Sequence, residues 1–200
     1  MGWKRGAYPE YTLEDAVGTI FLLKELLGRK QISELLDLGE GSVRTLLRKL
    51  TSNGLIGSKQ RGHFLTKKGE ALREELLKEF SEPVPLPSVD GYPACGIVIR
   101  RPGPFKSLEL RDEAIRFRAR GALILLMKDG KIVFPEDERP LADTYPELDA
   151  EIMRRLSPEG GDLVVVTWAD EPPWAFKSAI HVALFLKGGK IPGELKEVIR

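Results

Sequence analysis

The chain has 200 residues, of which 42% are hydrophobic and 30% charged, and its formal net charge is +1. This composition fits one large or two small folded domains and excludes a disordered chain, while the balanced charge by itself indicates no partner. A single cysteine and two histidines exclude a disulfide framework and a multi-cysteine zinc site.

The first 80 residues are predicted to be mainly helical. Thr12 can cap a helix that starts at Leu13, with Asp15 as the capping acid and Gly28 at its end. A short helix over residues 31–38 and a third helix over residues 40–51 follow. The third helix carries an apolar stripe with the spacing i, i+3, i+4, i+7, which consists of Val43, Leu46, Leu47 and Leu50.

A hairpin is predicted directly after the third helix. Residues 55–59 and 63–65 form two β-like runs, joined across Gln60, Arg61 and Gly62, which gives the hairpin a basic tip. Thr66 can cap a fourth helix over residues 67–80. Its apolar side chains either pack on their own domain or contact a second subunit; they are Ala71, Leu72, Leu76, Leu77 and Phe80.

The charge of this half is unevenly distributed. Residues 41–68 contain no Asp or Glu. The basic residues in the same window are Arg44, Arg48, Lys49, Lys59, Arg61, Lys67 and Lys68. A merely solvated helical surface mixes the two signs, whereas a patch of one sign is typical of phosphate binding.

The run QISELLDLGEGSVRTLLRKLTSNGLIGSKQRGHFLTKKGE, residues 31–70, resembles the core of bacterial and archaeal winged helix-turn-helix transcription regulators. The resemblance covers about residues 12–80 and implies a recognition helix followed by a wing. The whole chain also resembles an uncharacterised archaeal family of two-domain winged-helix proteins, which implies no activity. Abundant charged residues and a single asparagine favour a thermophilic source.

The resemblance assigns roles to residues of the basic window. Arg44, Thr45 and Arg48 would enter the major groove, where arginine can pair with guanine. Ser42 and Lys49 would hold phosphates, and Lys59 and Arg61 on the wing would contact the backbone or the minor groove. A winged helix can also bind RNA or a protein, and a basic patch can be ordinary surface, so these alternatives stay open.

Prolines at positions 83, 85, 87 and 93 divide the chain. Proline at this density excludes a helix and predicts an extended linker over residues 81–92, between domains 1–80 and 93–200. The second domain is predicted to contain strands over 94–100, 121–128, 131–135 and 162–169, and helices over 106–120, 145–156 and 172–188. This β-α-β-β-α-β-α order predicts a four-stranded α+β sandwich, ferredoxin-like or related.

The second domain shows little recognisable chemistry. Cys95 lies in an apolar strand and is expected to be an inert core residue. The most suggestive segment is TWADEPPWAFKSAIH, residues 167–181, because strand ends of this kind often border small-molecule sites. The candidate ligand residues are Trp168, Asp170, Trp174, Lys177 and His181. Alternatively, the tryptophans fill core space, Asp170 caps a helix and His181 is half-buried.

The sequence therefore predicts an α+β protein that acts as a sequence-specific, non-catalytic regulator of transcription and binds double-stranded DNA. Its second domain would sense a small-molecule effector or form a homodimer, since one recognition helix reads few base pairs. The alternative is an enzyme or a small-molecule-binding protein whose winged helix is an appendage for RNA or protein. No apolar run approaches a membrane span, so we expect a cytoplasmic protein with no membrane partner. We also expect no cofactor and, with one cysteine and two histidines, no metal.

Overall fold

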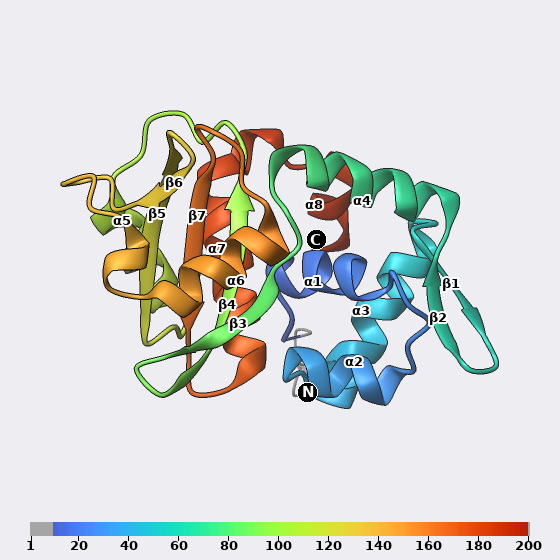
Figure 1. Ribbon diagram of the computed structural model, residues 1–200. Coiled ribbons are helices and arrows are strands. Elements are labelled where there is room, and N and C mark those ends of the chain that lie inside the picture. Colours follow the sequence, from blue (N-terminus) through green and yellow to red (C-terminus); the bar gives the residue numbers. More distant parts are fainter. Residues whose placement is uncertain (1–9, 200) are drawn as a thin grey trace, which may run out of the picture. The chain divides into compact units, whose positions relative to one another are not determined.

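The protein is an α+β protein with two sheets, seen in a computed structural model that describes residues 10–199 (Figure 1). It divides into two compact units. The helix–hairpin unit comprises the chain up to Leu72 together with the segment that starts at Gly193. The sheet unit comprises Arg73–Pro192.

Three helices form the body of the helix–hairpin unit: α1 (Leu13–Leu22), α2 (Arg29–Leu36) and α3 (Glu40–Ser52). The predicted capping box at the start of α1 is confirmed, because the Asp15 amide donates to Thr12 Oγ1 and the Thr12 amide donates to Asp15 Oδ2. The predicted stripe of α3 is also confirmed, since all four of its apolar residues are buried. The first helix ends earlier than predicted, at Leu22 rather than near Gly28.

A two-stranded antiparallel hairpin, β1 (Ile56–Lys59) and β2 (Gly62–Leu65), follows α3 as predicted. Leu27 adds a bridge to it, because the amides of Leu27 and His63 each donate to the carbonyl of the other, at 3.2 and 2.8 Å. This pairing explains why α1 stops early, since residue 27 must be extended to reach the hairpin. Gly62 is required here: its φ is +152°, and a Cβ would lie 2.6 Å from the Leu27 carbonyl oxygen.

The last helix of the chain, α8 (Gly193–Val198), belongs to the helix–hairpin unit and not to the predicted domain 93–200. It packs on α1 and α3 (Figure 1). The Tyr11 hydroxyl donates to the Val198 carbonyl at 2.9 Å. Leu195 and Val198 are fully buried. A helix of six residues is unstable alone, so it folds where a core can cover its apolar face.

The fourth helix, α4 (Lys67–Glu79), starts at the predicted cap, where the Gly69 amide donates to Thr66 Oγ1 at 3.1 Å. Leu72 and Leu76 of α4, and Phe80 directly after it, are at most 4% exposed. They therefore pack within the protein and are not available for contact with a second subunit, which was the other possibility that the sequence left open. Ala71 is exposed and Leu77 is partly buried.

Gly69→Ala is expected to destabilise the helix–hairpin unit by about 1–3 kcal/mol or more. A Cβ at this position would lie 2.0 Å from the Leu55 carbonyl oxygen, so α4 would have to move off the hairpin. Gly41→Ala is the matched control, because a Cβ there meets nothing within 4 Å. Chemical denaturation of both variants measures the difference, and equal unfolding midpoints would show that the contact is unimportant.

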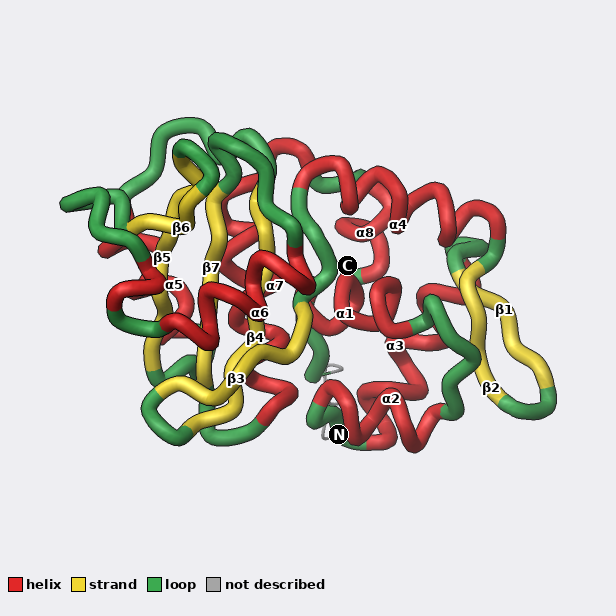
Figure 2. The backbone as a smooth tube through the Cα atoms, in the orientation of Figure 1, coloured by secondary structure: helices red, strands yellow, loops and turns green. Residues whose placement is uncertain are grey.

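The sheet unit contains five antiparallel strands rather than the predicted four, in the spatial order β3-β4-β7-β5-β6 (Figure 2). The strands are β3 (Val84–Val89), β4 (Tyr92–Ile99), β5 (Gly121–Lys128), β6 (Lys131–Val133) and β7 (Leu163–Trp168). β7 separates β4 from β5, which gives a split β-α-β arrangement related to the ferredoxin-like fold.

The additional strand, β3, lies where the sequence predicted a linker. Residues 84–86 pair with residues 94–96 of β4, and the register shifts between Leu86 and Val89. Proline cannot donate to a sheet ladder, but an edge strand needs donors on one side only, so Pro85 and Pro87 are tolerated there. The prediction of a linker over 81–92 was wrong because the apolar residues between the prolines, such as Leu86, pack against the sheet core.

Helices cover both faces of the five-stranded sheet. One face carries α6 (Pro146–Leu156), which packs on β3 and β4. The other face carries α5 (Ser107–Arg116) on β5 and α7 (Pro172–Lys187) on β4 and β7. Two short 3-10 helices, Leu141–Asp143 and Gly188–Lys190, complete the unit. All three predicted helices are confirmed, with α5 four residues shorter at its carboxyl end.

Candidate nucleic-acid interface

A groove of about 560 Å³ lies between α3 and the hairpin of the helix–hairpin unit. α3 contributes one wall through Arg44, Leu47, Arg48, Thr51 and Ser52, and the hairpin contributes Ser58 and His63. Arg29, the first residue of α2, completes the lining. Three arginines and no acidic side chain line this groove, so its surface is cationic.

The buried stripe of α3 determines how its basic side chains are presented. Val43, Leu46, Leu47 and Leu50 fix one face of the helix in the core. Arg44 and Arg48, four residues apart, therefore project together from another face, and both are exposed. Within residues 10–199, neither guanidinium group has an acidic partner, so both remain available to an anion outside the chain.

The hairpin presents Lys59 and Arg61 to solvent. The Lys59 ammonium lies 4.8 Å from the centre of the Phe64 ring, across the hairpin. This cation–π contact limits the freedom of a long side chain, while Arg61 is exposed in the turn between β1 and β2. Lys68, beyond the hairpin, donates to the Asn53 carbonyl at the end of α3 at 3.0 Å.

The remaining predicted residues lie on α3 outside the lining of the groove. Ser42, Thr45 and Lys49 are each partly exposed. The Thr45 hydroxyl donates to the Gly41 carbonyl at 3.1 Å, which leaves its oxygen able to accept a further hydrogen bond. The structure thus brings Arg44 and Arg48 together in the groove and arranges the other five predicted residues on the same two elements.

Arg29 was missed by the sequence analysis, although the pair Arg29-Lys30 next to a predicted helix was a usable signal. Its place in the groove depends on the Leu27–His63 bridge, which brings the start of α2 to the hairpin. His63 is a strand residue, as predicted, and it lines the groove. Its Nδ1 atom is buried without a hydrogen-bond partner among the described residues.

The predicted ligand residues of the sheet unit do not form one site. Trp174, Lys177 and His181 share one face of α7, towards α5. The Lys177 ammonium and the Arg118 guanidinium each lie 3.8 Å from the Trp174 ring, and Phe117 stacks on His181 at 4.5 Å. These side chains therefore contact one another where α5 packs on α7.

A hydrogen bond completes this cluster. His181 Nε2 lies 3.1 Å from Glu113 Oε2, and this hydrogen bond, assisted by Arg116, lowers the pKa of Glu113 although burial opposes the change. Trp168 belongs to the opposite side of the sheet, where it packs with the core under α6. Asp170 is exposed and binds Arg120 through two hydrogen bonds of 2.8 and 3.1 Å.

Cys95 is the inert core residue that the sequence predicts. It is 5% exposed in β4, and burial raises the pKa of its thiol to about 12. The thiolate required for nucleophilic chemistry is therefore scarce at neutral pH. Among residues 10–199, no helix combines the length and the apolar character that crossing a bilayer requires.

These features define a two-unit α+β protein with a cationic helix–hairpin groove. Residues 12–71 match the family model for the PH0730-like N-terminal domain, and residues 91–186 match a domain of unknown function, DUF4443. The hypothetical protein PH0730 from Pyrococcus horikoshii OT3 is 59% identical, with a TM-score of 0.90 over 94% of this chain and 100% of the relative. A search of curated proteins found no significant match.

The chain therefore belongs to the PH0730-like family. The level of identity and the nearly complete coverage extend this membership to both units. The first family match ends one residue before the helix–hairpin unit gives way to the sheet unit. The second match begins at Gly91 and omits β3, the proline-containing strand that was predicted to be a linker.

Proposed function

We propose that this protein is a sequence-specific DNA-binding regulator of transcription and that its helix–hairpin unit is a winged helix-turn-helix domain. In this proposal α3 is the recognition helix and the β1–β2 hairpin is the wing. Three helices followed by a hairpin, and an extended residue between the first two helices, Leu27, that pairs with this hairpin, support the assignment. Membership of the PH0730-like family does not indicate an activity.

The single observation that carries the proposal is the groove with three arginines. Phosphate groups neutralised by Lys and Arg supply most of the affinity for DNA, so an interface needs exposed cations on one face. Arg29, Arg44 and Arg48 meet this requirement in one concave surface. Residues 41–68 contribute no acidic side chain that would repel the phosphates.

The residues of α3 and the hairpin that the sequence nominated have the following proposed roles. Arg44 and Arg48 read base edges in the major groove, because a guanidinium fork can donate to guanine O6 and N7 together. Thr45 lies between them on α3 and contributes a methyl and a hydroxyl group. Ser42 and Lys49 hold phosphates beside the major groove. Lys59 and Arg61 on the wing contact the backbone or the minor groove.

The sheet unit has no catalytic role in this proposal. The cluster around Trp174 and His181 would be the site of a ligand-binding protein or an enzyme, but its side chains already contact one another. We therefore assign the sheet unit to oligomerisation or effector sensing. A regulator of this kind acts on the chromosome and would be found in the cytoplasm.

Binding of the full-length protein to duplex DNA across a salt series tests the proposal. A dimer that presents Lys49, Lys59 and Arg61 twice makes about six phosphate contacts, so its affinity should fall by about 10³-fold between about 50 and 200 mM salt. Fluorescence anisotropy with a labelled duplex measures this slope. No binding at the lowest salt, or binding that ignores salt, would contradict the proposal.

A further inference from the structure

The two edges of the five-stranded sheet differ in how they are protected against pairing with a strand of another molecule. The β3 edge contains Pro85 and Pro87 and an irregularity between Leu86 and Val89, all features that discourage pairing with another strand. At the opposite edge, the open stretch of β5 contains neither a proline nor a register shift. Only residues 126–128 of β5 pair with β6, so residues 121–125 have no partner strand on that side among the described residues.

The open part of β5 reads Gly-Ala-Leu-Ile-Leu, without a proline or a charge. Lys128 and Lys131 flank the two-residue turn that joins β5 to β6, so they form a hydrogen-bonded pair. Hydrogen-bonding direction alternates along an antiparallel strand. The backbone groups of Ile124 and Ala122 therefore face the same open side as those of Lys128.

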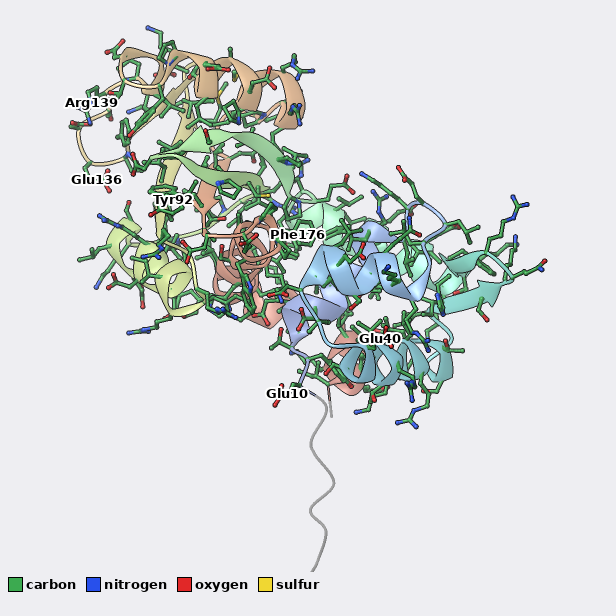
Figure 3. All side chains as sticks on the ribbon, turned by 90° about the horizontal axis from the view of Figure 1, so that it is seen from below. Glu10, Glu40, Tyr92, Glu136, Arg139 and Phe176 are labelled. Carbon is green, nitrogen blue, oxygen red and sulfur yellow. The ribbon has the colours of Figure 1, made fainter. Side chains whose placement is uncertain are left out.

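A depression of about 270 Å³ lies over this open edge. It is lined by residues 122–124 of β5, by Ser107, Leu108 and Arg111 of α5, and by Phe134 and Glu136 after β6. Glu136 is exposed and projects from its loop into solvent (Figure 3). Residues 122–124 thus border a depression at the edge of the sheet, although Ala122 and Ile124 are each only 6% exposed.

The helix beside the edge carries an unusual apolar surface. Leu108 is 69% exposed, the highest value for a large apolar side chain among residues 10–199, and Ile115 is 43% exposed. Leu108, Arg111, Asp112 and Ile115 have the spacing i, i+3, i+4, i+7 and form one stripe along α5. Its ends are apolar, and its centre contains one positive and one negative charge.

We infer that the open edge of β5 and this stripe of α5 form a homodimer interface, in which β5 of two copies pair antiparallel across a two-fold axis. The axis is perpendicular to the sheet, so both copies of α5 lie on the same face and run in opposite directions. Leu108 then meets Ile115 of the second copy, and Arg111 meets Asp112 of the second copy. The stripe is self-complementary, as an interface with two-fold symmetry requires.

The same symmetry determines the register of the strands. Ala122 pairs with Ile124 of the second copy, and Leu123 pairs with itself on the axis. Phe134 and Glu136 restrict the pairing to these central residues. The inference specifies the oligomerisation part of the proposed function and does not depend on DNA binding, because the interface involves only the sheet unit.

Sedimentation equilibrium of the full-length protein without DNA tests the interface. The wild-type protein should have the mass of a dimer at micromolar concentrations. The double substitution Leu108→Glu, Ile115→Glu should raise the dissociation constant by at least about 100-fold, because it removes apolar contacts at both ends and adds like charges. Met153→Glu, at a 37% exposed position of α6 on the other face, is the matched control and should remain dimeric.

A cysteine on the axis tests the register. Directly opposite residues in a non-hydrogen-bonded pair have Cα atoms about 4.5 Å apart, within the range of a disulfide. Oxidised Leu123→Cys should therefore form a covalent dimer, whereas Met153→Cys should not, and the buried Cys95 does not compete. Circular dichroism checks that each variant is folded. A monomeric wild-type protein, or a dimer that survives both glutamates and leaves Leu123→Cys uncrosslinked, would overturn the inference.

Discussion

Replacing Arg44 and Arg48 together by alanine is expected to lower the affinity for the preferred duplex by about 10²–10⁴-fold. Each bidentate contact between arginine and guanine contributes about 1–3 kcal/mol of discrimination, and the two side chains lie in one groove. Both are exposed and have no acidic partner in the described chain, so their removal should leave the fold intact. Selection from a random duplex library supplies the preferred sequence, and anisotropy measures the loss.

Two further measurements distinguish contacts with base edges from contacts with phosphates. Random duplex should lose much less affinity than the preferred sequence, because only phosphate contacts act there. Arg48→Lys keeps the charge but lacks the planar fork, so it should preserve the salt slope and relax the sequence preference. Equal losses on both duplexes would assign the two arginines to phosphate contacts instead.

Glu79→Ala is expected to destabilise the sheet unit by about 3–5 kcal/mol, because it leaves a buried charge without its partner. Lys187 is 4% exposed, and its ammonium lies 2.9 Å from Glu79 Oε2 and 2.8 Å from the Arg101 carbonyl oxygen. Glu151→Ala removes ion pairs with the exposed side chains of Arg154 and Arg155 and should cost much less, because solvent screens these charges. Chemical denaturation followed by tryptophan fluorescence measures both, and similar losses would contradict this account.

The same carboxylate makes the stability of the sheet unit depend on pH. Burial alone would raise the pKa of Glu79, but the hydrogen bond and charge of Lys187, with Lys190 and Arg101, bring it below its ordinary 4.5. Its stabilising contribution is therefore complete above that ordinary value and is lost as the pH falls through the lowered one. The stability difference between the wild-type protein and Glu79→Gln should accordingly shrink between about pH 6 and pH 3. A constant difference would contradict this prediction.

The elements of the helix–hairpin unit could be predicted from local sequence, because their signals are local. A capping pair, a four-residue apolar stripe and a turn around Gly62 each lie within a few residues of the structure they specify. The absence of acids from residues 41–68 is also a property of the sequence alone. These signals were enough to locate α3 and the hairpin and to nominate Arg44 and Arg48.

The errors occurred where distant residues decide the outcome. The prolines of residues 81–92 suggested a linker, but pairing with β4 turns the segment into an edge strand. Gly193–Val198 follows the second domain in sequence, yet Leu195 and Val198 are buried in the helix–hairpin unit. Trp168 and Trp174 are six residues apart, but alternation along β7 and the start of α7 separate them onto opposite faces of the sheet.

By itself, the sequence determined the kinds of elements, most of their limits and the sign of the charge on α3 and the hairpin. These follow from backbone preferences and side-chain periodicity, which act over a few residues. Only the tertiary structure decided that Arg29 joins the groove, that β3 extends the sheet and that residues 121–125 of β5 remain open. Such outcomes depend on contacts between residues far apart in the chain, because pairing and burial are settled only when the core forms.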